Sequence, residues 1–116
     1  MVVKMKEIKA FIRANKAETV IEALEEFGVK GVTLIDALGI GALADPEHSK
    51  YSIRCVKKYS DIAKLEVVCS KEYVHKVVEV IREKAYTGLK GDGVIYVSPV
   101  EVAVKIRTGA IGEEAL

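Results

Sequence analysis

The sequence predicts a single α+β domain whose elements follow the order β-α-β-β-α-β. Two segments carry apolar residues at helical spacing, and the segments around them either alternate in polarity or are rich in β-branched residues. The chain has 116 residues, and a chain of this length buries about two thirds of the surface that its unfolded form exposes. We therefore expect one compact domain over residues 1–116.

The first strand is expected at residues 6–13, where Ile8, Ala10 and Ile12 alternate with Glu7, Lys9, Phe11 and Arg13. A helix follows, because Asn15 and Glu18 have the spacing of an N-cap and its reciprocal acid. Gly28 is placed to end this helix in a left-handed conformation. Its buried stripe is expected to consist of Ala17, Val20, Ile21, Leu24 and Phe27.

The remaining elements follow from the same kinds of pattern. Strands are expected at residues 32–38 and 61–69, and Ser70 is expected to cap the second helix. The buried stripe of that helix is predicted to be Val74, Val77, Val78, Ile81 and Ala85. Residues 94–97 and 100–106 form two further strand-like runs, which we separate at Pro99 because a central strand does not hold proline in its interior.

This order is the ferredoxin-like plan, in which both helices cover one face of an antiparallel sheet. The other face would then be bare, with Phe11, Val68 or Leu65 beside the charged Lys64 and Glu66. A half-apolar sheet face without cover is usually buried by self-association. We therefore expect a closed homo-oligomer, with ligand sites that neighbouring subunits can share.

A segment of little periodicity, residues 40–60, separates the second and third strands. Loops longer than about 12–15 residues are uncommon inside compact domains and are often functional. The segment is either a long hairpin with an unstructured tip or a mobile loop that changes shape on ligand binding and contacts a partner. The sequence leaves both interpretations open.

Composition argues against several classes of protein. The formal net charge of +1 creates no field that would draw the chain to nucleic acid or to an anionic membrane. No apolar run approaches the ~20 residues of a membrane span, and the N-terminus does not have the form of a signal sequence. Cys55 and Cys69 lack the spacing of a metal or redox motif. We expect a cytoplasmic protein that neither binds nucleic acid nor enters a membrane.

The most informative local feature is the glycine turn at residues 87–93, in which three glycines let backbone N–H groups converge on an anion. Lys105 and Arg107 stand at i and i+2 of an expected strand, so both side chains would leave one face and reach one phosphate. Together these features favour a polyphosphate site. The turn alone is equally an ordinary αβ turn, because it lacks the Lys-Ser/Thr ending of a P-loop.

Catalytic signals are weak by comparison. We find no Ser/Cys–His–acid set, no close pair of carboxylates and no metal quartet, so neither catalytic residues nor a resident cofactor is expected. His75 lies off the apolar stripe of the second helix and is interpreted as solvated, and His48 lies in the long segment, where spacing specifies no metal site.

With this element order, loop and glycine turn, the chain resembles the PII signal-transduction proteins over nearly its whole length. The most specific segments are residues 31–33, 39–41, 87–93 and 105–109. The resemblance implies a homotrimer whose subunit clefts bind ATP or ADP, and a long T-loop that signals to transporters, enzymes or transcription regulators, chiefly of nitrogen metabolism. It places the T-loop at about residues 40–60, the contact with an unidentified target protein there, and a flexible tail at about 108–116.

The resemblance also implies roles for individual residues. Thr33 and the backbone of Val68 correspond to the adenine contacts. The ribose and phosphates would lie beside Gly41, Ala42 and Leu43. The phosphates would be held by Gly91, Asp92 and Gly93 with the adjoining Val94, and by the cationic segment Lys105, Ile106 and Arg107 from across the interface.

Several positions depart from the family pattern. Leu43 stands where the family has a glutamine that holds Mg-ATP and 2-oxoglutarate, and Ile62 replaces the lysine that meets the keto acid. Val94 replaces a phosphate-binding lysine, and Lys105 replaces an arginine, which exchanges a planar fork for a point charge. The nucleotidylated tyrosine of some members falls on Cys55.

These departures favour a divergent sensor of ADP or AMP over Mg-ATP, and not a standard 2-oxoglutarate sensor. A trimeric metal-tolerance protein of the CutA kind, which shares the subunit plan, and a small enzyme of the same fold are the alternatives.

Overall fold

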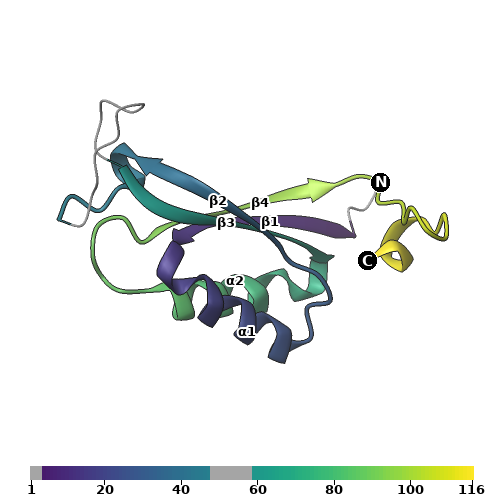
Figure 1. Ribbon diagram of the computed structural model, residues 1–116. Coiled ribbons are helices and arrows are strands. Elements are labelled where there is room, and N and C mark those ends of the chain that lie inside the picture. The colour runs from purple at the N-terminus through teal and green to yellow at the C-terminus, as the bar shows by residue number, and fades with distance from the viewer. Residues whose placement is uncertain (1–3, 48–58) are drawn as a thin grey trace.

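The computed structural model describes residues 4–47 and 59–116, with Tyr59 described by its backbone alone. The elements follow the predicted order: β1 (Met5–Arg13), α1 (Ala17–Phe27), β2 (Thr33–Ile40), β3 (Tyr59–Ser70), α2 (Val74–Ala85) and β4 (Gly93–Val100). Both helices lie on one face of the sheet, as Figure 1 shows. The predicted α+β, ferredoxin-like architecture is confirmed.

The four strands form one sheet in the order β2-β3-β1-β4, and every neighbouring pair is antiparallel. Alternate residues of the two central strands point to the helices and form the core, as the period of two requires. Fully buried members include Ile8, Ala10, Leu65, Val67, Val20, Leu24, Val77 and Ile81. Burying one such aliphatic side chain contributes about 1.5–3 kcal/mol, so this layer stabilises the fold.

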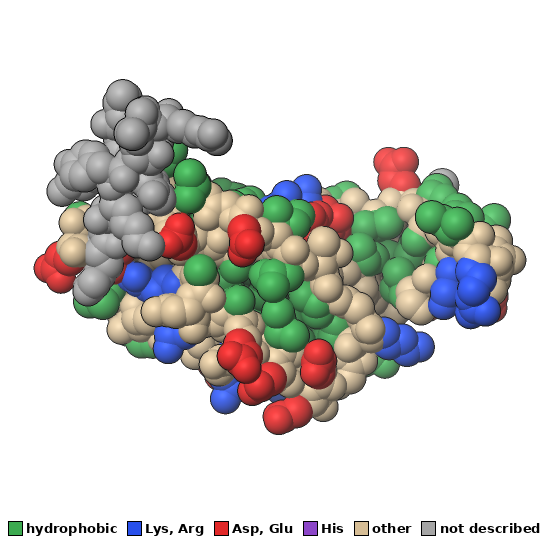
Figure 2. Space-filling view, viewed as in Figure 1, with side chains coloured by type: hydrophobic (Ala, Val, Ile, Leu, Met, Phe, Trp, Pro, Cys, Tyr) green, Lys and Arg blue, Asp and Glu red, His purple; other side chains and the backbone are tan. Residues whose placement is uncertain are grey.

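The outer surface of the helices is polar. Figure 2 shows acidic side chains gathered at the bottom of the view, where Figure 1 places α1. Glu18, Glu22, Glu25 and Glu26 of α1 are all exposed. The predicted apolar stripe of α1 therefore faces inward, although Phe27 at its end is 40% exposed.

The predicted helix starts are wrong in detail. Instead of an Asn15 cap, residues Ala14–Lys16 form a 3₁₀ turn, whose carbonyl at Ala14 accepts the N–H of Ala17. The same arrangement precedes α2, where Lys71–Tyr73 form a 3₁₀ turn and Ser70 makes no side-chain capping bond. In both places a backbone carbonyl oxygen accepts a backbone N–H at the start of the helix, where the side chain of Asn15 or Ser70 was expected to accept one.

The predicted end of α1 is confirmed. Gly28 has a φ of 107° and donates its backbone N–H to the carbonyl oxygens of Leu24 and Glu25. This is the left-handed cap that only glycine adopts without strain.

The predicted break at Pro99 is also wrong, because β4 runs without interruption from Gly93 to Val100. In the described part of the chain β4 is an edge strand that pairs with β1 alone, and an edge strand tolerates proline because one of its sides needs no ladder bonds. Residues 101–106 are not a strand. The chain instead turns back, with the N–H of Lys105 donating to Ala110 O and Val104 bridging to Ile111.

The face of the sheet opposite the helices carries the predicted mixture of apolar and charged side chains. Phe11 meets Tyr96 edge to face at 6.1 Å between ring centroids, and the ammonium of Lys64 lies 5.7 Å from the Phe11 ring. Val68 shares this face, since it lies opposite Glu7 of β1. Leu65 does not: its register places it opposite Ala10 on the helix side, where it is fully buried.

Candidate functional site

A pocket of about 930 Å³ lies at the outer edge of β3. β2 begins opposite Glu66, so β3 extends past it, and in the described part of the chain no strand covers the outer edge of residues 67–70. Edge backbone groups of this kind can hydrogen-bond to a ligand. Thr33 and Val68, the two predicted adenine contacts, both line this pocket.

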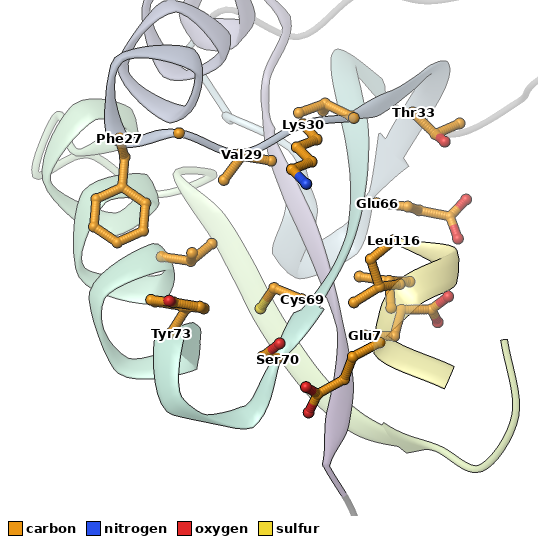
Figure 3. Close-up of a pocket in the computed structure, with 16 residues that line it drawn as sticks. Glu7, Phe27, Val29, Lys30, Thr33, Glu66, Cys69, Ser70, Tyr73 and Leu116 are labelled. Carbon is orange, nitrogen blue, oxygen red and sulfur yellow. The ribbon is translucent and has the colours of Figure 1, made fainter. Parts of the chain in front are cut away.

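The walls of the pocket differ in character. Figure 3 shows Phe27 and Tyr73 on one side, and Thr33, Glu66 and Leu116 on the other. The two aromatic rings meet edge to face at 6.4 Å between centroids. An aromatic wall beside an uncovered strand edge suits a flat heteroaromatic ring, whose edge can bond to the backbone.

Cys69 also lines this pocket, but it is not activated. Burial raises the pKa of the Cys69 thiol above its ordinary value. A neutral thiol is a poor nucleophile, so Cys69 contributes shape rather than chemistry.

The glycine turn lies at the far end of the sheet, between α2 and β4. Gly88, Gly91 and Gly93 have φ values of 88°, 95° and 108°. At Gly91 an added Cβ would lie 2.9 Å from the backbone nitrogen of Asp45, so the turn packs directly on the base of the long loop. Both the backbone angles and this close approach require glycine.

Asp92 holds the turn together. Its carboxylate accepts hydrogen bonds from the backbone N–H of Thr87 at 2.9 Å and of Gly88 at 2.8 Å, and from the Thr87 hydroxyl. Arg13 Nε donates a further bond at 2.9 Å. Burial alone would raise the pKa of Asp92, but these bonds outweigh it and hold the pKa well below its ordinary value. Asp92 therefore organises the turn as an anion, and its oxygens are engaged within the chain.

Sequence reasoning missed Arg13, which is the centre of the polar network at this end. Arg13 Nη1 donates to Asp45 Oδ2 at 2.7 Å, and Nη2 donates to the carbonyl oxygen of Lys90 at 2.8 Å. Burial lowers the pKa of Arg13, but its bonds to Asp92 and Asp45 outweigh this and raise it. The one signal in the sequence was an arginine at the end of an otherwise alternating strand, and nothing there pointed to partners 32 and 79 residues away.

The predicted ribose and phosphate segment, Gly41–Leu43, forms a 3₁₀ turn directly after β2. It folds back over the sheet, since an added Cβ at Gly39 would lie 2.5 Å from the Leu43 carbonyl oxygen. The side chain of Ile62 lies beside Gly39 and is buried. Asp45 joins this segment to the glycine turn, so the structure brings together Gly41, Ala42, Leu43, Gly91, Asp92, Gly93 and Val94 at one end of the sheet.

Lys105, Ile106 and Arg107 lie at the other end. Gly93 is opposite Ile12, whereas Val100 is opposite Met5, and the three residues follow Val100. At about 3.3 Å per residue, the length of β4 separates them from the turn by some 20 Å or more. The expectation that they share a strand face is wrong, because this segment is a turn in which Ile106 is fully exposed.

The predicted contacts thus form two groups. The turn half-site comprises residues 41–43 and 91–94, and the edge half-site comprises Thr33, Val68 and residues 105–107. The C-terminal segment that follows residues 105–107 reaches the pocket of Thr33 and Val68, because Glu113 and Leu116 line it. Within one chain the two half-sites lie apart. The turn half-site is at the Ile12 end of the sheet, Thr33 and Val68 lie farther along, level with Lys9 and Glu7 of β1, and residues 105–107 follow Val100 at the other end.

The remaining candidates are simple to place. His75 is exposed on α2, as predicted, while His48 and Cys55 lie outside the described residues. Residues 4–47 and 59–116 contain no group of three or more His, Cys, Asp and Glu side chains that could hold a metal ion. None of the helices in the described part of the chain has both the length and the hydropathy needed to cross a bilayer.

Comparisons with known proteins agree with this architecture. The sequence model of a family described as "Nitrogen regulatory protein P-II" matches residues 5–110. Nitrogen regulatory protein P-II of Azospirillum brasilense is 39% identical over 112 residues, which are 97% of this chain and 100% of that protein. The homologous protein of Oryza sativa is 38% identical over 109 residues, which are 93% of this chain and 51% of that longer protein.

Two solved structures extend the comparison. Arabidopsis thaliana PII bound to citrate matches with a TM-score of 0.81 and 34% identity, covering 97% of this chain and 92% of that one. The GlnK–ATP complex of B. subtilis matches with a TM-score of 0.80 and 28% identity, covering 99% of this chain and 100% of that one.

Proposed function

Because the chain belongs to the nitrogen regulatory protein P-II family, we propose that it senses adenine nucleotides and transmits their presence to a partner protein of nitrogen metabolism. One observation carries the proposal: the predicted nucleotide contacts are divided between two half-sites that lie apart within one chain. Such a division suits a ligand that binds between subunits. ATP bound to the similar GlnK protein supports the choice of ligand.

We propose a homotrimer in which the edge half-site of one subunit meets the turn half-site of the next. Head-to-tail contacts of this kind form a closed ring when the rotation between subunits closes. Ile35, Leu38 and Tyr96 are apolar strand residues that one chain leaves 40%, 52% and 58% exposed, and neighbouring subunits would cover such residues.

In the assembled site the base would enter the pocket between Thr33 and the backbone of Val68. The phosphates would lie against the amides of Gly91 and Gly93 and the loop base at Gly41, with Lys105 and Arg107 supplying positive charge. Asp92 acts indirectly in this arrangement, because its carboxylate is committed to the turn.

The preferred nucleotide would be ADP or AMP. Leu43 and Val94 offer no oxygen for Mg²⁺ and no cation for a third phosphate, and buried Ile62 offers no charge to a keto acid. We therefore propose weak binding of Mg-ATP and of 2-oxoglutarate. Calorimetry with AMP, ADP, Mg-ATP and 2-oxoglutarate tests this, and strong Mg²⁺-dependent synergy between ATP and 2-oxoglutarate would contradict it.

Nucleotide binding would be signalled by a conformational change in the long loop at residues 40–60, which would contact the partner protein. A ligand shifts such a loop only by its differential affinity for two states, commonly ~1–3 kcal/mol. We propose that the protein acts by binding and not by turnover, so nucleotide hydrolysis should stay at background. We do not propose a function in metal tolerance, because the family that the chain matches is P-II.

Subunit mixing tests the shared site directly. Arg107→Ala removes a cation from the edge half-site, and Gly91→Val distorts the turn half-site, because its Cβ would lie 2.9 Å from the backbone nitrogen of Asp45. Each homotrimer should bind ADP poorly, whereas a mixed trimer contains one interface at which both halves are intact. Recovery of binding after unfolding and refolding the two variants together supports the proposal. Equal loss in the mixture and in the separate variants refutes a site shared in this way.

A further inference from the structure

We infer that Arg13 is the positioning residue that couples the glycine turn to the base of the long loop. A ligand held at the turn then changes the loop base through the Arg13 guanidinium. The ligand part of this inference rests on the proposed nucleotide binding, whereas the coupling itself does not.

One guanidinium reaches three anchors on two separate segments. Nε and Nη2 bond to Asp92 and to the Lys90 carbonyl of the turn, at 2.9 and 2.8 Å, while Nη1 bonds to Asp45 of the loop base at 2.7 Å. The guanidinium is a rigid planar fork, so a shift at one anchor changes the geometry at the others.

The backbone of Arg13 is also fixed in position by the core. It is the last residue of the central strand β1, and the preceding Ile12 is only 2% exposed in the core. When the glycine turn moves, the end of β1 that carries Arg13 therefore cannot move freely with it. Displacement of the turn has to be taken up by the side-chain bonds, including the bond to Asp45.

The charges of the network make this link strong. The side chains of Arg13, Asp45 and Asp92 are 14%, 5% and 25% exposed, so solvent screens their interaction only partly. Two carboxylates share one cation. An anion bound at the turn adds negative charge beside the same cation and so alters its attraction for Asp45.

Two backbone amides report on the position of Asp45. The N–H of Asp45 donates to Ser60 Oγ at 2.8 Å, and the N–H of Glu47 donates to Asp45 Oδ1 at 2.9 Å. Hydrogen exchange at these amides measures the opening of the loop base. A direct route also exists, because the backbone at Gly91 packs against Asp45, and the test has to separate the two routes.

The first arm uses the full chain without ligand. Asp92→Asn perturbs the turn, and we expect exchange at Asp45 and Glu47 to become about fivefold faster or more, within the usual range of coupling between sites. In an Arg13→Gln background the same substitution should add no further acceleration, because the link is already absent. Equal acceleration in both backgrounds would assign the coupling to the Gly91 contact and overturn the inference.

Matched controls keep this arm specific. Asp36→Asn removes an exposed carboxylate from β2, and Arg82→Gln removes an exposed arginine from α2. Neither should change exchange at the loop base. If Arg13→Gln does not fold, as exchange at core amides such as Ile8 would reveal, Arg13→Lys replaces it, since lysine keeps the charge and loses the fork.

The second arm adds saturating ADP. In the unsubstituted protein ADP should change exchange at Asp45 and Glu47, whereas in Arg13→Gln it should bind without that change, and Arg13→Lys should be intermediate. An undiminished response in Arg13→Gln overturns the inference. If the unsubstituted protein binds no adenine nucleotide by calorimetry, the proposed function fails, and the first arm still decides whether Arg13 couples the two segments.

Discussion

Gly93 and Phe11 lie so close together that a Cβ on Gly93 would overlap the carbonyl oxygen of Phe11. The glycine opens β4 at the point where this strand joins β1, with a φ of 108°. Two independent constraints, the left-handed backbone and the lack of space, therefore fix glycine at the end of the phosphate-binding turn predicted from the sequence.

Gly93→Ala should destabilise the protein by about 2–4 kcal/mol, because it adds both backbone strain and a clash with the backbone. Gly31→Ala is the matched control, since an added Cβ there meets nothing within 4 Å. Urea unfolding of both variants measures the difference. Similar midpoints for the two variants would show that β4 moves away from β1 at little cost.

Leu65→Ala should reduce the free energy of unfolding by about 2–5 kcal/mol, the range for a large side chain lost from a packed core. Leu34 lies opposite Leu65 on the neighbouring edge strand but is 49% exposed. Leu34→Ala should therefore cost less than about 1 kcal/mol in the monomer, and chemical denaturation of both variants checks the contrast. A larger loss for Leu34→Ala that depends on protein concentration would instead identify it as a subunit contact.

The stability of the protein should fall in acid partly through Asp92. The folded pKa of Asp92 lies below its unfolded value of about 3.9, so the unfolded state binds the proton more readily. Its contribution is therefore fully present above about pH 4 and is lost as the pH falls below that value. Asp92→Asn should be less stable than the unsubstituted protein at pH 7, and its unfolding free energy should decline less between about pH 4 and pH 2.

Thermal unfolding across this pH range measures the effect, and Asp36→Asn, on the exposed surface of β2, serves as its control. Parallel pH profiles for Asp92→Asn and the unsubstituted protein would mean that the carboxylate contributes no pH-dependent stability.

Val94→Lys should raise the affinity for ATP more than the affinity for AMP, by about tenfold in the ratio, because the new cation lies next to the turn and favours added phosphate charge. Val94 is half-buried opposite Phe11, so the long lysine side chain must extend past the ring. Calorimetry with both nucleotides measures the ratio, and Val97→Lys, farther along β4, controls for the added charge. An unchanged ratio would remove residue 94 from the phosphate site.

The elements of the fold were largely predictable, since periodicity and cap residues are local properties of the chain. The stripe Val77, Ile81 and Ala85 and the left-handed cap at Gly28 follow from spacing alone. Pro99 misled the prediction because its tolerance depends on β4 being an edge strand, and the position of a strand within a sheet is not a local property. The starts of both helices were misplaced for a related reason: a backbone carbonyl replaced the expected side-chain cap.

The candidate site was likewise predictable only in part. The sequence by itself determined the element order, the glycine turn and the family resemblance, because these depend on residue types at short spacing. Only the tertiary structure decided that Arg13 joins Asp45 to Asp92, and that residues 105–107 lie at the end of the sheet away from the turn. Contacts across 32 and 79 residues depend on strand register and sheet order, which arise when the core packs and leave no pattern along the chain.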